Sequence, residues 1–321
     1  MKRGFIMKHA LVLGASGGMG YSIVHELVNR GIKVTAFARS EEKLQKLFKG
    51  LNLVTIQSGD IFDMNQLVTA ASQVDIIFQS ANLPYEQWSE KLIPFYKNVI
   101  QTAEVTGAKL AFVENIYAYG KSASKKVTET MKKNPHTKKG KIRLQVEELV
   151  KKTNVETIIA HFPDFYGPNA ENSILHYTLK NVIQHKTAYF VGDQRIAREF
   201  IYTPDGAKAL VNLALEDTAY GQNWNIPGYD VITGDQLVAI LRNLLGYKKP
   251  VFTVTKGMIK MLGLANPTMR EVVEMFYLNE EPVILNGAKY EKEIGPLPRT
   301  SYQEGLKQTV HYMATGTFQK A

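Results

Sequence analysis

Three glycines at three-residue spacing, Gly14, Gly17 and Gly20, stand between a short apolar run at 10–13 and a segment with helical periodicity. Glycine lets the backbone approach a phosphate closely, and the free N–H groups and dipole of a helix N-terminus favour negative charge. Tight turns also collect glycine for conformational reasons alone. The strand pattern before the turn and the helix pattern after it favour a cradle for the pyrophosphate of a dinucleotide.

The residues that end the second apolar run, at 33–37, indicate which dinucleotide is bound. A carboxylate there would bind the ribose 2′-hydroxyl of NAD, whereas a basic residue accommodates the 2′-phosphate of NADP. This chain ends the run with Ala38, Arg39 and Ser40, none of which is acidic. We therefore expect NADP, with NAD as the alternative.

The elements that must position these residues alternate regularly along the first half of the chain. Apolar runs that predict strands occupy 10–13, 33–37, 53–57, 74–78, 110–113 and 155–160. Helical patterns lie between them, at 41–48, 63–71, 88–106 and 140–152. This alternation predicts an α/β fold with a doubly wound parallel sheet, the Rossmann fold, and binding groups beyond the C-terminal strand ends.

The pattern loosens after about residue 160. Helices are predicted near 173–185 and from a capping box at 233–236, and strands near 188–191 and 199–203. We expect residues 1–162, with part of 187–225, to form the dinucleotide-binding domain. Residues 163–321 should form mainly a smaller α/β substrate-binding lobe.

The composition excludes several classes of protein. The chain has 321 residues and no cysteine, so disulfides, thiolate nucleophiles and cysteine-ligated metals are ruled out. The histidines show no ligand-like spacing, and we expect no metal site. No apolar run approaches the length of a membrane span, and residues 1–8 lack the hydrophobic core of a secretory signal. We expect a cytoplasmic protein without a membrane partner.

Basic residues dominate the net charge of +9 and concentrate between Lys121 and Lys152. A nucleic-acid surface would need aromatic residues interleaved with the lysines, and these are missing, so we expect no nucleic-acid partner. Residues 120–139 also contain Asn134-Pro135, which breaks a helix. We interpret this stretch as an exposed loop and the lysines as a solvated face.

The motifs resemble those of the extended short-chain dehydrogenases/reductases, the group that contains nucleotide-sugar epimerases and dehydratases. The GASGGMG segment at 14–20 resembles the family's Gly-x-x-Gly-x-x-Gly turn, and Ser58–Ile61 resembles its Gly-Asp-hydrophobe step. Ala118–Gly120, Phe165–Pro168 and residues 191–209 resemble further family motifs. The resemblance implies a fold and a cofactor that agree with those expected from the pattern.

Expected cofactor contacts follow from the glycine turn, the strand ends and the resemblance together. They are Gly14, Ser16, Gly17, Gly18, Met19, Gly20, Arg39, Ser40, Asp60, Ile61, Ser80, Ala81, Asn82, Arg143 and Phe162.

The family's oxidoreductase chemistry uses a Ser or Thr, and a Tyr four residues before a Lys. The lysine lowers the tyrosine pKa, so that the phenolate exchanges a proton while hydride moves to or from nicotinamide. Registration on the family's motifs puts the Ser position at Asn115, the Tyr position at Lys139 and the Lys position at Arg143. All three family residues are therefore replaced.

Substitute acid–base groups are expected at the end of the fifth strand, where nicotinamide should lie. Tyr117, Tyr119 and Glu114 occupy that place. Arg143 could still bind the nicotinamide ribose, which needs only a donor. Lys139 has two interpretations, a lysine of lowered pKa that binds an acidic substrate, or a solvated lysine in a basic loop. The candidate catalytic residues are Asn115, Tyr117, Tyr119, Lys139 and Arg143.

The substrate contacts implied by the resemblance are Glu114, Asp164, Tyr166 and Arg198. Asp164 replaces an asparagine that often contacts a nucleotide-sugar phosphate in the family, and a carboxylate would repel phosphate. Arg198 matches an arginine that commonly binds the substrate pyrophosphate. It could equally form a surface ion pair with Glu199 or Asp205.

Three functions remain open. The first is an NADP-dependent oxidoreductase or epimerase-like enzyme of an atypical branch, acting on a small carbonyl or hydroxyl compound. The second is a catalytically silent redox sensor or regulatory protein that binds NADP. The third is a nucleotide-sugar epimerase or dehydratase. We expect a monomer or a homodimer, since the family forms its dimer interface from helices matching 88–106 and 140–152.

Overall fold

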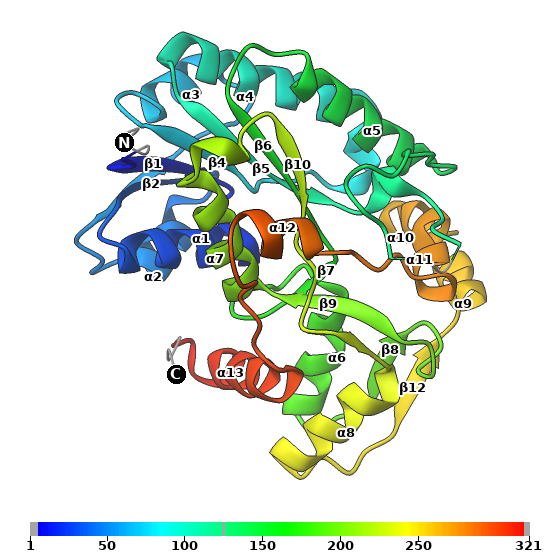
Figure 1. Cartoon of the computed structure of the whole chain (residues 1–321). Coiled ribbons are helices and arrows are strands. Elements are labelled where there is room, and N and C mark those ends of the chain that lie inside the picture. Colours follow the sequence, from blue (N-terminus) through cyan, green and yellow to red (C-terminus); the bar gives the residue numbers. More distant parts are fainter. Residues whose placement is uncertain (1–5, 124–125, 318–321) are drawn as a thin grey trace.

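The computed structural model describes residues 6–123 and 126–317 (Figure 1). Within these residues, a seven-stranded sheet has the order β10-β6-β5-β4-β1-β2-β3, and its neighbouring strands run parallel. The strands are β1 (His9–Leu13), β2 (Lys33–Ala38), β3 (Val54–Ser58), β4 (Ile76–Gln79), β5 (Lys109–Asn115), β6 (Thr157–Phe162) and β10 (Gln222–Asn225). The doubly wound α/β fold expected from the sequence is confirmed.

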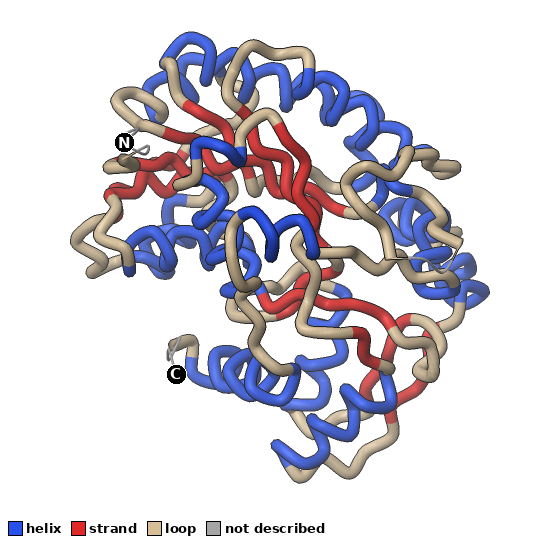
Figure 2. The backbone as a smooth tube through the Cα atoms, in the orientation of Figure 1, coloured by secondary structure: helices blue, strands red, loops and turns tan. Residues whose placement is uncertain are grey.

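Helices cover both faces of this sheet (Figure 2). One layer contains α1 (Gly18–Asn29), α2 (Glu41–Phe48) and α7 (Thr203–Ala214). The other contains α3 (Met64–Ala70), α4 (Ile93–Thr106) and α5 (Lys138–Lys151). A hydrophobic core lies on each face of the sheet, and alternate residues of β1 pack into one or the other. This follows because successive side chains of a strand point to opposite faces. Ala10 and Val12 pack with α1, whereas Leu11 and Leu13 pack on the side of α4.

The C-terminal part of the chain builds a smaller region below the large sheet in Figure 1. A three-stranded sheet contains β7 (Asp164–Tyr166), β9 (Arg198–Tyr202) and β11 (Val231–Ile232), and a second pairs β8 (Ala188–Val191) with β12 (Val251–Val254). Around them lie α6 (Ile174–Ile183), α8 (Gly234–Leu245) and α13 (Tyr302–Thr315). Helix α8 begins with the predicted capping box, in which Thr233 and Gln236 exchange hydrogen bonds.

A group of short helices at residues 256–280, named here the cap, lies beside the end of α5 (Figure 1). It consists of α9 (Lys256–Leu262), α10 (Pro267–Val273), η5 (Glu274–Phe276) and α11 (Tyr277–Glu280). Helix α10 packs against η1 (Tyr85–Gln87), which precedes the π-helix η2 (Trp88–Leu92) and α4. The other short elements are η3 (Tyr117–Tyr119), η4 (Asp217–Ala219) and α12 (Ala288–Glu293).

The expectation of an exposed loop at 120–139 is confirmed for Lys121, Lys126, Lys132 and Lys138, which are exposed, and is wrong for several residues between them. Val127 is buried and forms a β-bridge with Leu285, so this stretch pairs with a segment distant in the sequence. Lys133 and Lys139 are also buried, in ion pairs. Residues 1–5 and Lys125 lie outside the described part of the chain. Among the described helices, none has the length and apolar character to cross a membrane.

Candidate active site

A cleft of about 800 Å³ lies at the carboxyl ends of the strands of the large sheet. Lining residues follow each of β1 to β6, and residues 169–174 before α6 close the opposite wall. Parallel strands end on one side of the sheet, so segments far apart in the sequence meet there. This is the place where the sequence pattern predicts binding groups.

The glycine turn forms one wall of the cleft. Gly17 is the N-cap of α1 and supplies no side-chain cap, so the first N–H groups of the helix are left for a ligand. A Cβ at Gly20 would lie 2.2 Å from the carbonyl oxygen of Gly14, so only glycine fits there. At Gly17 the nearest atom to an added Cβ is 3.5 Å away, which leaves an open face. The turn fits a dinucleotide pyrophosphate.

The cleft brings together most of the expected cofactor contacts. Gly20 packs inside the turn, and Arg143 lies behind Asn82. The expected contacts that line the cleft are Gly14, Ser16, Gly17, Gly18, Met19, Arg39, Ser40, Asp60, Ile61, Ser80, Ala81, Asn82 and Phe162.

Positive charge gathers at the end of the cleft next to β2. Arg39 is exposed, lines the cleft and makes no hydrogen bond or ion pair with another described residue. Lys43, one helical turn into α2, also lines the cleft and is paired with Glu171 at 2.8 Å. Ser40 accepts a hydrogen bond from the backbone N–H of Lys43 and thereby caps α2. The free guanidinium is suited to bind an anionic group.

Arg143 is buried behind the cleft and joins it through Asn82. Its Nη2 donates to Asn82 Oδ1 at 2.8 Å, and its Nη1 lies 3.2 Å from both carboxylate oxygens of Glu114. Burial opposes the cation, but Glu114, Tyr96 and Tyr117 together outweigh it and raise the pKa of Arg143. The Nε atom is buried without a partner among the described residues. Arg143 therefore reaches the cleft only through Asn82, and its Nε stays inside the protein.

The structure contradicts the expectation that Glu114 contacts substrate. Its side chain is 4% exposed, does not line the cleft and accepts hydrogen bonds from Tyr96 and Arg143. Residues alternate sides along a strand, and Glu114 points into the layer of α4 and α5 while Asn115 reaches the cleft. Glu114 is the counter-ion of Arg143.

Two tyrosines meet on the wall of the cleft next to β5. The hydroxyl oxygens of Tyr85 and Tyr117 lie 2.6 Å apart, and both residues line the cleft. Asn115 accepts a hydrogen bond from the backbone N–H of Tyr117 at 3.0 Å and fixes the start of η3. Burial raises the pKa of Tyr117 well above its ordinary value, and it raises the pKa of Tyr85 to about 12. Both phenols are therefore protonated at neutral pH.

Asp164 adds a carboxyl group to the same part of the cleft. Burial raises its pKa, although the positive charge of Arg198 acts in the opposite direction. It lines the cleft and makes no hydrogen bond or ion pair with another described residue. Its electrostatic influence reaches both tyrosines, whose pKa values it raises. Asp164 is thus available to a ligand.

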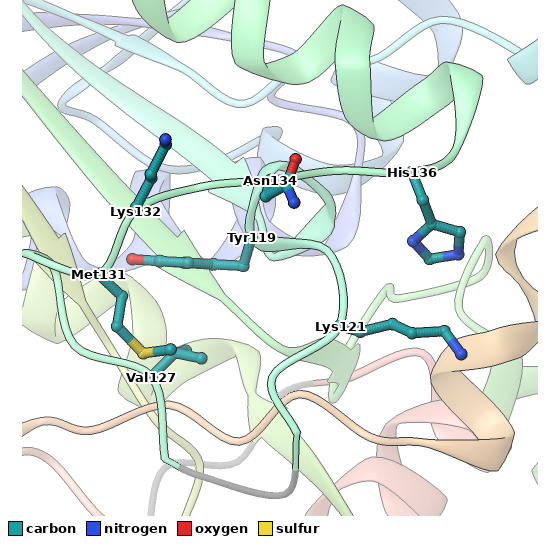
Figure 3. A pocket seen from close by; sticks show the side chains of 7 residues that line it. All are labelled: Tyr119, Lys121, Val127, Met131, Lys132, Asn134 and His136. Atoms are coloured by element: carbon teal, nitrogen blue, oxygen red, sulfur yellow. The ribbon is translucent and has the colours of Figure 1, made fainter.

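Tyr119 does not join this group, contrary to the expectation of a catalytic role. It lines a separate pocket of about 220 Å³, where Lys121 and His136 lie on the other side (Figure 3). Its hydroxyl donates to Asn225 Oδ1 at 2.7 Å. Tyr117 and Tyr119 are two residues apart on a 3₁₀ turn of three residues, so their side chains point in different directions.

Lys139 is neither in the cleft nor solvated, so both interpretations of it are wrong. It is 1% exposed, and its Nζ lies 2.5 Å from Glu271 and 2.8 Å from Glu274 of the cap. The backbone N–H of Lys139 also donates to Glu274. The side chain at the family's tyrosine position therefore fastens the cap to α5.

Arg198 is engaged away from the cleft and forms no surface ion pair. Its guanidinium donates to Asn279 of α11 and, at 2.9 Å, to the carbonyl oxygen of Val191. Glu199 instead accepts backbone hydrogen bonds from Gly228 and Leu285. The alternative pairing of Arg198 with Glu199 or Asp205 is wrong. Successive residues of β9 point to opposite faces, and Asp205 on α7 accepts hydrogen bonds from Thr300.

Tyr166 also lies outside the cleft, in the core of the C-terminal region. It is 1% exposed and packs against the rings of Tyr202 and Tyr302. Asp164 and Phe165 line the cleft, whereas the ring of Tyr166 lies in this core. The expected substrate contact of Tyr166 is not seen.

Tyr85 was missed by the sequence reasoning. It sits in the segment after β4, six residues beyond the strand, and no motif marks it. In the sequence, the one available signal is the pair of aromatic residues Tyr85 and Trp88 shortly after the end of β4. In the structure, their rings pack edge to face with centroids 5.0 Å apart. Among the residues that the structure describes, no group of His, Asp and Glu side chains is arranged to hold a metal ion.

Known proteins share both the sequence family and the fold. The family model for the NAD dependent epimerase/dehydratase family matches residues 10–226. A UDP-N-acetyl-alpha-D-glucosaminuronate decarboxylase from Bacillus cytotoxicus is 21% identical over 95% of this chain and 97% of its own. A 2-alkyl-3-oxoalkanoate reductase from Shewanella oneidensis is 34% identical over 119 residues, which are 37% of this chain and 29% of the reductase.

Solved structures share the fold along nearly the whole chain. A dTDP-glucose 4,6-dehydratase from Bacillus anthracis, in complex with NAD, has a TM-score of 0.78 and 18% identity, and covers 96% of each chain. A UDP-N-acetylglucosamine 4-epimerase from Methanobrevibacter ruminantium, in complex with UDP-N-acetylmuramic acid, has a TM-score of 0.79 and 18% identity, over 98% of this chain and 100% of its own. Because the family model spans most of the chain, this protein belongs to the NAD dependent epimerase/dehydratase family.

Proposed function

We propose that this protein is an NADP-dependent oxidoreductase or epimerase-like enzyme that reduces a small carbonyl compound, with Tyr117 as the proton donor. The observation that carries the proposal is the pair of phenols, Tyr85 and Tyr117, 2.6 Å apart in the cleft that also contains the glycine turn. The buried Lys139 occupies the family's tyrosine position, so a tyrosine at another position acts as the proton donor.

The cleft residues suggest how the cofactor is held. The glycine turn binds the pyrophosphate, the free guanidinium of Arg39 binds the 2′-phosphate, and Asn82, held by a hydrogen bond from Arg143, binds the nicotinamide ribose. The bound cofactor supplies the hydride. Structures of family members are described with NAD, so the 2′-phosphate preference rests on Arg39 and on the absence of an acid at the end of β2.

The chain's own task is to deliver a proton to the carbonyl oxygen of the substrate. Tyr117 is protonated at neutral pH, because burial raises its pKa. When its proton moves to the substrate, the hydroxyl of Tyr85 donates a hydrogen bond to the new phenolate oxygen and stabilises it. At neutral pH Tyr117 is in the protonated form that carbonyl reduction needs, whereas alcohol oxidation would require the phenolate as a base.

The charges around the cleft favour a substrate without a pyrophosphate. Arg39, Lys43 and Lys91 are the cations among its described lining residues, and none of them follows β5 or β6, where Tyr117 and Asp164 lie. Arg198 is held by Asn279 and Val191. A diphosphate at this end would therefore meet the Asp164 carboxyl group, with Arg198 held behind it and no cation among the described lining residues there.

A nucleotide-sugar epimerase or dehydratase is the second candidate. It is favoured by the length of the likeness to the Bacillus cytotoxicus decarboxylase, which spans 95% of this chain. It would need Arg198 to leave Asn279 and turn toward the cleft.

The two candidate functions differ in which substrates lead to oxidation of NADPH. We expect the purified protein to oxidise NADPH with simple aldehydes, ketones or β-keto acids, and to show no spectral change with UDP-glucose, UDP-N-acetylglucosamine or dTDP-glucose. Turnover confined to the sugar nucleotides would establish the second candidate. NADPH binding without turnover in either panel would identify a cofactor-binding sensor and overturn both.

A further inference from the structure

The cap exposes a cluster of apolar side chains that no other part of the described chain covers. Helix α9 buries Ile259 alone, and α10 buries none of its residues. Of the twelve large hydrophobic side chains that are exposed among the described residues, four fall within 258–264. They are Met258, Met261, Leu262 and Leu264, with exposed fractions from 41% to 82%. Clusters of this kind mark interaction sites more often than isolated exposed residues do.

Charge is distributed unevenly around this cluster. Residues 246–270 contain five basic residues and no aspartate or glutamate. The basic residues are Lys248, Lys249, Lys256, Lys260 and Arg270. The acids that follow, Glu271 and Glu274, point toward the body of the protein and bind Lys139. A third acid of the cap, Glu280, is exposed and lies 3.4 Å from Lys256. Helix α9, which carries most of the exposed apolar side chains of this cluster, lies at the rim of the molecule (Figure 1).

We propose that this part of the cap, residues 256–270 and here named the cap edge, docks on the surface of an anionic lipid bilayer. Methionine and leucine side chains seat at the boundary between headgroups and acyl chains, while flanking lysines are drawn to the anionic headgroups. The helices are too short to do more than lie in the interface.

The charge pattern argues against a second copy of the chain as the occupant. A two-fold contact through the same surface would bring Lys260 of one copy close to Lys260 of the other, and residues 256–270 contain no acid to compensate. Lys256 already pairs with Glu280. An anionic bilayer supplies the missing counter-charge. This departs from the sequence-based expectation of no membrane partner, which rested on the absence of a spanning segment.

Docking would also hold the cleft near the bilayer. Helix α10 packs on η1, the turn that carries Tyr85, and Thr268 Oγ1 lies 3.5 Å from Glu86 Oε2. The cap edge and the phenol pair are therefore parts of one connected surface.

Sedimentation of the full chain with sucrose-loaded vesicles tests the proposal. We expect binding to equimolar phosphatidylcholine and phosphatidylglycerol, little binding to pure phosphatidylcholine, and weakening as salt rises. Met261→Ser with Leu264→Ser should lower the partition coefficient by at least about tenfold. Lys260→Glu should lower it as well. Val105→Ser is the control, because Val105 is 63% exposed on α4, away from the cap.

Retained NADPH binding shows that each variant is folded. Absence of binding to the anionic vesicles, or equal binding by the Met261 and Leu264 variant, would overturn the proposal. So would self-association of the wild type that the same variant abolishes without any vesicle binding, since the occupant would then be a second copy. Preference for a soluble acidic polypeptide, such as polyglutamate, over the vesicles would assign the edge to a protein partner instead.

Discussion

Tyr85 and Tyr117 reach the same point of the cleft from segments 32 residues apart, and their phenolic oxygens are 2.6 Å from each other. Burial raises the pKa of Tyr85 to about 12 and that of Tyr117 well above its ordinary value. Both oxygens therefore carry a proton at neutral pH, so one hydroxyl donates to the other and one proton is left for a further acceptor. Under the proposed function, this proton goes to the substrate.

Removing the Tyr117 hydroxyl should abolish most of the turnover. Loss of a positioned general acid typically costs about 10²–10⁴-fold in rate, so we expect Tyr117→Phe to lower kcat by that amount with little change in NADPH affinity. Tyr85→Phe should cost less, because Tyr85 only stabilises the phenolate. The measurement is the decrease of NADPH absorbance at saturating substrate. Tyr189→Phe, at a residue 48% exposed on β8, controls for the loss of a phenol. Full activity of Tyr117→Phe would refute the assignment.

Arg39 should determine the preference for NADP. Because its guanidinium is exposed and has no partner among the described residues, Arg39→Ala should weaken NADPH binding by about tenfold, or about 1.4 kcal/mol, and leave NADH binding nearly unchanged. Titration by nicotinamide fluorescence measures both affinities. Arg242→Ala on α8 removes an exposed arginine far from the cleft and should affect neither. Equal weakening of both cofactors would show that Arg39 does not read the 2′-phosphate.

The fold and the position of the cleft could be predicted because they depend on local patterns. Strand and helix periodicity gives the order of the elements, and the parallel connection rule then gathers the strand ends on one side. Gly14, Arg39, Asp60 and Asn82 line the cleft because each follows a strand of that sheet. Their place required no knowledge of side-chain contacts.

The directions and partners of individual side chains could not be predicted. Lys139 is buried because Glu271 and Glu274, more than 130 residues away, reach it from the cap. Arg198 is withdrawn from the cleft by Asn279, which is 81 residues away. Tyr119 was separated from Tyr117 by a 3₁₀ turn that periodicity does not reveal. Each of these outcomes depends on long-range packing.

The glycine turn offers a test that separates binding from folding. Gly20→Ala would place a Cβ 2.2 Å from the Gly14 carbonyl oxygen, and overpacking of this kind costs about 1–3 kcal/mol, so we expect a lower melting temperature and lost NADPH binding. Gly17→Ala meets its nearest protein atom at an ordinary 3.5 Å and should melt like the wild type. Its methyl group would occupy the open face of the turn, so NADPH binding should still fall. Unimpaired binding by Gly17→Ala would mean that the pyrophosphate lies elsewhere.

A buried charge network supports the end of β5 from behind. Glu147 on α5 is 3% exposed and binds Lys133, and it lies 3.4 Å from His161 Nε2. His161 Nε2 lies 2.8 Å from Lys133 Nζ, and its Nδ1 lies 2.9 Å from the carbonyl oxygen of Asn115, to which it donates a hydrogen bond. Through this bond the network positions Asn115 and the start of η3.

Glu147→Gln should destabilise the fold in a pH-dependent way. Burial alone would raise the pKa of Glu147, but His161 and Lys133 outweigh it and hold that pKa far below the ordinary glutamate value of 4.5. The stabilisation is thus complete above pH 4.5 and is lost as pH falls below it, where the unfolded chain takes up a proton that the folded chain does not.

Denaturant unfolding across pH measures this effect. At neutral pH, Glu147→Gln should cost about 3–5 kcal/mol, because it leaves the buried Lys133 ammonium without its counter-ion. The difference in unfolding free energy between wild type and variant should narrow as pH falls below 4.5, because the stabilisation by Glu147 is lost there. The other carboxylates titrate in both proteins, so their effects cancel in this difference. Glu148→Gln, at the exposed neighbouring position, should be close to neutral at every pH. A difference that stays constant from neutral to acidic pH would show that the Glu147 side chain contributes packing and not charge.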